Sequence, residues 1–244
     1  MIICPDYKLC FIQVPHTAST DIADFLLSEM GGIRVLAKHS LLPEFKFYFP
    51  KEYKTYYVLG GLRDPFLERI SIFNKYESDH GGRYSTTKPK NGRMHSIARD
   101  QKIHREILSG ELDFNEYFKK YCRYTFYSNV YCLKERFNAF YKLENIQSDL
   151  QDIFWEVGYK SEFKIKKENT SVSRRPIIIN DWYSDDSLRK ASLLYRRYCI
   201  DFSYEMPLYT TPTKLDLAKE YYDHQLKRLI WLGGMYKHRK YYES

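Results

Sequence analysis

The stretch Leu9–Ile22, which reads LCFIQVPHTASTDI, joins two kinds of structural element through a short polar turn. Its first six residues are a mostly apolar run of β-formers, as in a strand buried on both faces of a parallel sheet. Small and polar residues follow in Pro15–Thr20. An amphipathic helix is then expected, with Ser19 or Thr20 as its N-cap and an apolar face made of Ile22, Ala23, Leu26 and Leu27. The stretch therefore predicts a strand–turn–helix unit.

The same alternation continues along the chain. Further strands are expected at Gly32–Ala37, Thr55–Leu62 and Phe137–Glu144, because each is short, apolar and rich in β-formers. Amphipathic helices are expected between Phe66 and Tyr76 and over Ile146–Gly158, where the glycine is a C-cap. Alternating strands and helices predict an α/β fold with a central parallel sheet flanked by helices.

Other segments have weaker patterns. Helices are expected at Phe114–Tyr121 and between Leu188 and Tyr198, and polar, basic loops at Glu77–Met94 and Lys164–Pro176. A basic, aromatic helix is expected from Leu215 to Tyr242. We therefore expect one α/β domain over residues 1–210, with residues 211–244 as its C-terminal basic helical extension.

The composition favours anionic partners. The 244 residues include 39 Lys and Arg against 31 Asp and Glu, a net charge of +8, which is also compatible with an ordinary basic surface. No signal peptide is apparent, and no apolar run approaches the ~20 residues that span a bilayer, so a cytoplasmic protein without a membrane span is expected. The five cysteines form no CxxC pair and predict neither a zinc site nor a disulfide framework. Cys10 is expected to be buried.

The turn Pro15–Thr20 has the chemistry of an oxyanion site. A helix that starts directly after a strand points several backbone N–H groups, and the positive end of its dipole, at one place. Thr17, Ser19 and Thr20 add hydroxyl groups. The chain contains no GxxxxGK[ST] motif, so a nucleotide kinase of that type is disfavoured. An ordinary Ser/Thr-rich helix start is the simpler alternative.

A second stretch, Val58–Tyr76, places an arginine at the end of a strand. It reads VLGGLRDPFLERISIFNKY, so Arg63 would lie at the carboxyl edge of the sheet, where α/β proteins bind ligands. Ser71 follows two helical turns later. An arginine and a serine suit a phosphate group. The alternative is that Arg63 pairs with Asp64 or Glu68.

Together, PHTAST and RDPFLERISIF resemble the two nucleotide-binding motifs of the PAPS-dependent sulfotransferases, in the carbohydrate branch and most like the uronyl 2-O-sulfotransferases. YKLENI at Tyr141–Ile146, the ENTSVSRRP loop and YRRYCIDFSYE resemble later landmarks, so the resemblance covers roughly Leu9–Tyr204. It implies a P-loop-like three-layer fold and PAPS (3′-phosphoadenosine 5′-phosphosulfate) as sulfuryl donor, without a metal. The acceptor implied is a hydroxyl group, on a glycan or on a small hydroxylated molecule.

The resemblance also implies site residues. The 5′-phosphosulfate would be held by Pro15, His16, Thr17, Ala18, Ser19 and Thr20. The 3′-phosphate would contact Arg63 and Ser71, with Arg174 and Arg175 as clamps from the second basic loop. The first basic loop, Asp79–Arg93, would border an acidic acceptor.

Two histidines carry the expected catalysis. His39 follows the second expected strand, where the family has a histidine base, and would take the acceptor's proton. His16 stands where the family has a lysine that stabilises the leaving phosphate. Either His16 does this work when protonated beside phosphates, or Lys38 substitutes, or activity is weak. The alternative function is thus a non-catalytic or weakly active nucleotide- or polyanion-binding protein with the same fold. No nucleic-acid partner is expected, because RRM, KH and zinc-finger patterns are missing.

Overall fold

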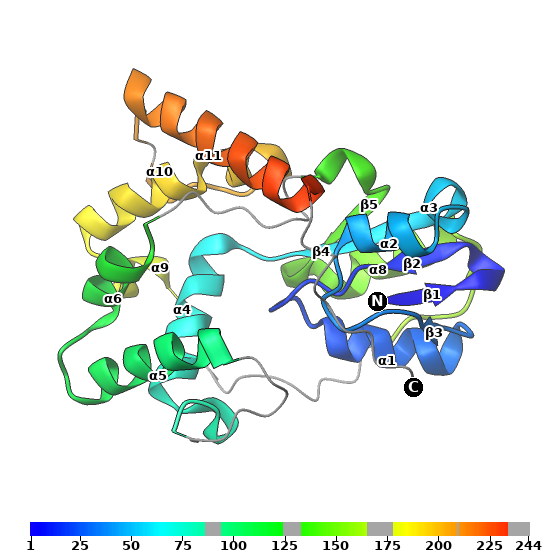
Figure 1. Ribbon diagram of the computed structural model, residues 1–244, viewed down its shortest axis with the longest axis horizontal. Helices are drawn as coiled ribbons and strands as arrows, with labels where there is room; N and C mark the ends of the chain where they lie inside the picture. Colours follow the sequence, from blue (N-terminus) through cyan, green and yellow to red (C-terminus); the bar gives the residue numbers. More distant parts are fainter. Residues whose placement is uncertain (86–93, 124–132, 165–177, 209, 234–244) are drawn as a thin grey trace. The chain divides into compact units, whose positions relative to one another are not determined.

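The computed structural model describes residues 1–85, 94–123, 133–164, 178–208 and 210–233 (Figure 1). The chain forms two compact units. Unit 1 comprises Met1–Asp64, Tyr127–Thr170 and Ala218–Ser244, and unit 2 comprises Pro65–Phe126 and Ser171–Leu217. The expected α/β domain over residues 1–210, with residues 211–244 as its C-terminal extension, stays a prediction.

Unit 1 contains a five-stranded mixed sheet with the strand order β3-β1-β2-β4-β5. Its strands are β1 (Ile2–Cys4), β2 (Leu9–Phe11), β3 (Ile33–Arg34), β4 (Tyr57–Leu62) and β5 (Ala139–Lys142). Strands β2, β4 and β5 run parallel, while β1 is antiparallel to both β2 and β3. The α/β class is confirmed, and the expected parallel sheet is found in β2, β4 and β5, whereas β1 and β3 make the whole sheet mixed.

The antiparallel part of the sheet forms at the start of the chain. β1 and β2 form a hairpin through the 3-10 turn η1 (Pro5–Tyr7), which ends at Lys8 with a left-handed φ of 47°. So short a connection can join only antiparallel strands. The strand expected at residues 32–37 is reduced to β3, an edge strand with Ile33 51% exposed.

The remaining expected strands are confirmed with shorter bounds. The first ends at Phe11 instead of Val14, although the N–H of Ile12 still donates to the carbonyl of Leu59 at 2.9 Å. β4 begins at Tyr57, since Thr55 closes the short helix α3 (Glu52–Thr55). β5 occupies the middle of the expected Phe137–Glu144 strand.

Helices lie on both sides of the sheet (Figure 1). Helices α1 (Ser19–Glu29) and α8 (Ile146–Glu156) share one core with β1 and β2, in which Phe25 stacks on Phe154 at 5.5 Å between ring centroids. The short helices α2 (Leu42–Tyr48) and α3 lie on the other side of the strands. The chain after α8 passes through Gly158 at φ 100°, which confirms the expected glycine stop.

Unit 2 is helical. It contains α4 (Pro65–Glu77), η2 (His80–Gly82), α5 (Met94–Leu108), α6 (Phe114–Tyr121), α9 (Ile179–Trp182) and α10 (Asp185–Phe202). Its core is aromatic: Phe66 meets Tyr195 edge to face at 5.0 Å, and Phe114 meets Tyr183 at 4.7 Å. Asp113 caps α6 by accepting from the N–H of Glu116, and the bounds of α6 are those expected from the sequence.

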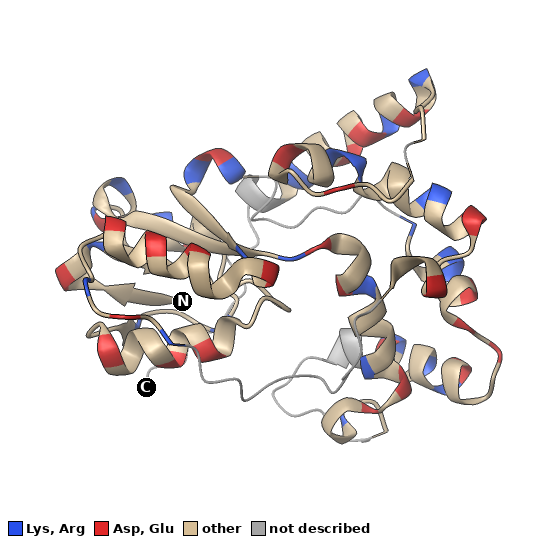
Figure 2. Ribbon diagram, turned by 180° about the vertical axis from the view of Figure 1, so that it is seen from behind, with Lys and Arg blue, Asp and Glu red and all other residues tan. Residues whose placement is uncertain are grey.

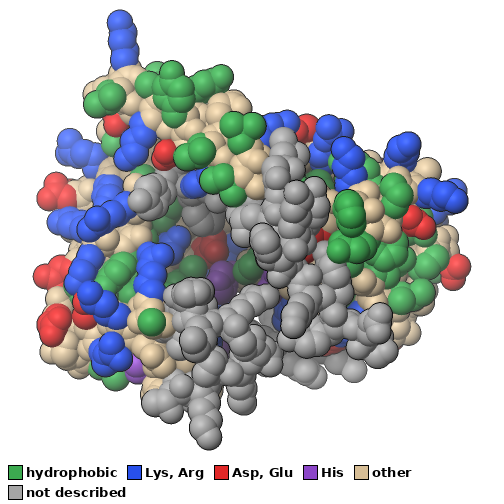
Figure 3. Space-filling model, viewed as in Figure 1, with side chains coloured by type: hydrophobic (Ala, Val, Ile, Leu, Met, Phe, Trp, Pro, Cys, Tyr) green, Lys and Arg blue, Asp and Glu red, His purple; other side chains and the backbone are tan. Residues whose placement is uncertain are grey.

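Helix α11 (Lys214–Gly233) confirms the start of the expected C-terminal helix; residues 234–244 lie outside the described part. Apolar side chains gather over this helix in Figure 3, and Tyr222 and Leu229 are 69% and 67% exposed. Acidic and basic residues are interspersed along the described helices (Figure 2). Within the described residues, no helix combines the length and apolarity needed to cross a bilayer.

Candidate functional site

The carboxyl ends of β2, β4 and β5 lie at one edge of the sheet in unit 1, because these strands are parallel. Three segments leave the sheet there: Ile12–Thr20, Arg63–Asp64 and the 3-10 turn η4 (Leu143–Asn145). Ligands of α/β proteins bind at such an edge. Their hydrogen bonds show that the three segments meet.

Thr17 anchors the polar turn to the sheet. Its Oγ1 donates to the carbonyl of Val14 at 2.9 Å, and the hydroxyl of Tyr141 donates to the carbonyl of Thr17 at 2.7 Å. Tyr141 is fully buried, and burial raises the pKa of its phenol, so the hydroxyl stays protonated as a donor. The Tyr141 side chain on β5 therefore holds the turn in place.

Gly61 makes this close packing possible. A Cβ at this position of β4 would lie 2.4 Å from the Tyr141 hydroxyl and 2.7 Å from Thr17 Oγ1. Both distances are shorter than any normal contact, so a side chain here would displace the turn. Close packing against Tyr141 and Thr17 therefore requires a glycine at this position, the second glycine of VLGGL.

The backbone of the site is strained at three residues. His16, Ala18 and His39 have left-handed φ values of 66°, 54° and 64°. Non-glycine residues in this region cost about 1 kcal/mol or more each, and they cluster at ligand sites. Ala18 is the N-cap of α1 and makes no side-chain cap bond, so the expectation that Ser19 or Thr20 caps this helix is wrong. Both residues are the first of the helix itself.

The strain leaves the start of α1 open to a ligand. Among the described residues, no backbone carbonyl accepts from the N–H groups of Ala18, Ser19 and Thr20. Pro15, His16 and Thr20 are exposed, whereas Thr17 is buried. N–H groups at a helix N-terminus without carbonyl partners attract an anion.

Two cationic side chains border the turn. Lys38 donates from Nζ to the Thr20 hydroxyl at 2.7 Å, and Arg63 donates from Nη1 to the carbonyl of His16 at 3.4 Å. The structure therefore brings the expected first-strand turn and the expected arginine together. It also places Lys38, one of the two expected substitutes for the family lysine, at this turn.

His39 is held in a defined orientation. Its Nδ1 lies 2.7 Å from the carbonyl oxygen of Gln13, which can only accept, so Nδ1 carries a proton. In the neutral ring, the lone pair then resides on Nε2, as a general base requires. The side chain of Gln13 in turn donates from Nε2 to the carbonyl of Ser19 at 3.2 Å, so Gln13 links the base, through its backbone carbonyl, to the polar turn, through its side chain.

A carboxylate supports the turn after β4. Glu144 accepts from the backbone N–H of Asp64 at 2.8 Å, which orients the neighbour of Arg63. Gln13 and Tyr141 are site residues that the sequence did not single out. A polar glutamine inside an apolar strand was the one available signal; the tyrosine resembled its apolar neighbours.

The remaining expected residues belong to unit 2 or lie outside the described residues. Ser71 lies on α4 in unit 2, where it is 6% exposed. Arg174 and Arg175, and residues 86–93 of the first basic loop, lie outside the described residues. In the described part of the chain, no three His, Cys, Asp or Glu side chains lie close enough to hold a metal ion.

Comparison with known proteins adds no relative: no protein-family model, curated protein or solved structure gives a significant match to this chain.

Proposed function

We propose that the protein is a PAPS-dependent sulfotransferase in which the sheet edge of unit 1 binds the phosphosulfate end of the donor. The observation that carries the proposal is the convergence of the strained turn Pro15–Thr20 with Lys38, Arg63 and His39. The resemblance of PHTAST and RDPFLERISIF to the family's two motifs supports the choice of nucleotide, and a P-loop-like three-layer fold is part of the proposal. The acceptor proposed is a carbohydrate hydroxyl.

The donor's 5′-phosphosulfate is a tetrahedral anion that matches the N–H groups of Ala18, Ser19 and Thr20. Lys38 supplies positive charge beside them, with its ammonium at the Thr20 hydroxyl. Under the proposal, Arg63 and Ser71 hold the 3′-phosphate and Arg174 and Arg175 close on it. His16 stabilises the leaving phosphate with Lys38 when its ring is protonated beside the phosphates, and its backbone carbonyl accepts from Arg63.

The reaction is an in-line transfer. The acceptor oxygen forms a bond to sulfur, the bond from sulfur to the 5′-phosphate oxygen breaks, and adenosine 3′,5′-bisphosphate leaves. His39 takes the acceptor's proton on Nε2. Lys38 and the turn's N–H groups stabilise the charge that develops on the leaving phosphate, the electrostatic contribution that usually dominates such steps.

Binding of adenosine 3′,5′-bisphosphate tests the proposal most directly. Thermal unfolding should shift upward with this ligand and not with ATP and Mg²⁺, because only a ligand of the native state stabilises it. Lys38→Met should reduce the shift, whereas Lys51→Met, a change of an exposed lysine at the start of α3, should not. No shift with the bisphosphate, or an equal shift with ATP, contradicts the proposal.

A second candidate function rests on His16. Because an exposed histidine occupies the family's lysine position, this candidate is a nucleotide- or polyanion-binding protein that carries out no transfer. Incubation with sulfur-labelled PAPS and a panel of glycans separates the two. Binding without release of the bisphosphate or labelling of any glycan favours the second.

A further inference from the structure

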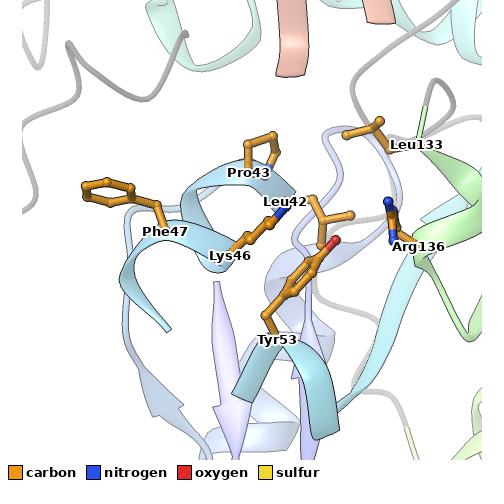
Figure 4. A pocket seen from close by; sticks show the side chains of 7 residues that line it. All are labelled: Leu42, Pro43, Lys46, Phe47, Tyr53, Leu133 and Arg136. Carbon is orange, nitrogen blue, oxygen red and sulfur yellow. The ribbon is translucent and has the colours of Figure 1, made fainter. Parts of the chain in front are cut away.

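A separate pocket opens in unit 1 between α2, α3 and the 3-10 turn η3 (Lys134–Arg136) that precedes β5 (Figure 4). Its volume is about 380 Å³. The pocket is lined by Leu42, Pro43 and Lys46 from α2, by Tyr53 from α3, and by Leu133 and Arg136 at η3. None of them belongs to the sheet-edge site.

The pocket combines an apolar floor with two positive charges. Leu42 and Leu133 are 1% and 2% exposed and form its buried part. Lys46 and Arg136 enter from opposite sides, with Tyr53 and its hydroxyl between them (Figure 4). Lys46 Nζ lies 5.9 Å from the centroid of the Tyr53 ring, which holds the ammonium above the pocket.

These two charges are not neutralised within the described residues. No ion pair there joins Lys46 or Arg136 to a carboxylate, and no carboxylate is among the lining residues identified. The acidic residues nearest along the chain bond to other groups, although the carboxylate of Glu135 also interacts electrostatically with its neighbour Arg136. Glu44 is buried and accepts from the N–H of Leu41, and Glu135 pairs with Arg228.

We propose that this pocket binds a small organic anion. An aromatic or branched aliphatic body would lie on Leu42 and Leu133, and a carboxylate, sulfonate or phosphate group would lie between Lys46 and Arg136. The volume lies within the range of about 300–1,000 Å³ that small-molecule sites occupy. Buried apolar side chains supply affinity, and the paired cations supply the selection for negative charge. The inference is independent of the sulfotransferase proposal.

The probe for the test is 2-naphthalenesulfonate, with the neutral 2-naphthalenesulfonamide as its matched analogue. Binding is measured by isothermal titration calorimetry and ligand-observed NMR on the full chain. The test variant is Lys46→Gln combined with Arg136→Gln. Two control variants remove a lysine elsewhere: Lys54→Gln, exposed on α3 beyond the pocket, and Lys38→Met at the sheet edge.

We expect saturable binding of the sulfonate that weakens about tenfold or more in the double variant, since each lost charge-assisted contact weakens binding several-fold. Both controls should bind the sulfonate as the native protein does, and the sulfonamide should bind more weakly than the sulfonate. Equal unfolding temperatures of all variants show that the loss is not misfolding. Three results would overturn the proposal: no saturable binding, equal binding of the two probes, or loss in Lys38→Met instead of the double variant.

Discussion

At position 39, a histidine adopts a left-handed backbone with φ at 64°, a conformation that is uncommon for residues other than glycine. The same conformation recurs at His16 and Ala18, so three strained residues border one edge of one sheet. Strain of this kind persists only where the surrounding contacts impose it. Here the contacts are those of Gln13, Thr17 and Tyr141, which hold the turn and the histidine in place.

His39→Asn separates catalysis from structure. Asparagine tolerates a left-handed φ and retains a side-chain amide, but it has no basic nitrogen. We expect turnover of PAPS to fall about 10²–10⁴-fold, the usual contribution of a general base, while the affinity for adenosine 3′,5′-bisphosphate stays nearly unchanged. Steady-state kinetics and calorimetry check this. Normal turnover in the variant would exclude His39 as the base.

Lys38 and His16 can be compared by the same substitution. We expect Lys38→Met to weaken bisphosphate binding about tenfold and to slow turnover further, because its ammonium lies at the Thr20 hydroxyl. His16→Met should change both less. Calorimetry and initial rates measure both variants. A larger effect of His16→Met than of Lys38→Met would assign the stabilisation of the leaving phosphate to His16.

Gly60 and Gly61, which are adjacent on β4, point to opposite faces of the sheet, so alanine substitutions at the two positions form a matched pair of variants. An added Cβ at Gly61 meets Tyr141 and Thr17, whereas at Gly60 the nearest atoms, at 2.9 Å, belong to the rings of Phe137 and Phe140. Overpacking typically costs about 1–3 kcal/mol, so both alanine variants should be less stable in urea. Only Gly61→Ala should also lose bisphosphate affinity. Equal affinities in the two variants would show that the turn is not set by this contact.

At the scale of elements, α1 and α8 hold their side of the sheet through aromatic packing. Phe25 stacks on Phe154 and meets Phe163 edge to face at 4.7 Å, and both partners of Phe25 are fully buried. This packing fixes the position of α1, and therefore of the N–H groups at its start. The stability of these helices and the geometry of the site are linked in this way.

Phe154→Ala should lower the free energy of unfolding by about 3–5 kcal/mol, because it leaves a cavity among packed rings. Its neighbour Trp155 is 49% exposed and supplies the control. Trp155→Ala should change stability by about 0.5 kcal/mol or less. Urea denaturation followed by circular dichroism measures both. Similar losses in the two variants would contradict the packing described here.

At the scale of the whole molecule, buried thiols connect stability to pH. Cys4 and Cys10 lie in unit 1, and Cys122 and Cys199 lie in unit 2; all four are buried. Burial raises the pKa of the Cys4 thiol to about 12, and it also raises the pKa values of Cys10 and Cys122. The folded protein therefore keeps these protons at a pH where the unfolded chain has lost them.

The sign of the effect follows from the proton balance. Above pH ~8.5 the unfolded state binds fewer protons than the folded state, so stability falls as pH rises toward the raised folded pKa values. We expect a loss of about 1–2 kcal/mol per buried thiol between pH 8 and pH 10. Urea titrations at the two pH values test this. Cys4→Ala with Cys10→Ala should flatten the dependence; an unchanged slope would assign it to other groups.

Several features of this protein depend on neighbours along the chain and could be predicted from the amino-acid sequence. The bounds of α6, the glycine stop after α8, the polar turn after β2 and the arginine at the end of β4 all follow from residues within one or two turns of each other. The convergence of this turn with Arg63 also followed, from the rule that parallel strands share an edge.

The other features depend on contacts between residues that lie far apart in the chain, and the folded structure was needed to see them. The antiparallel direction of β1 and the two-residue length of β3 are set by pairing, which local propensity does not encode. The roles of Tyr141 and Gln13 and the cap at Ala18 likewise come from packing across the sheet edge. The physical reason is that a segment's preference is a sum of small local terms, whereas burial and hydrogen bonding of the whole chain are larger and override them.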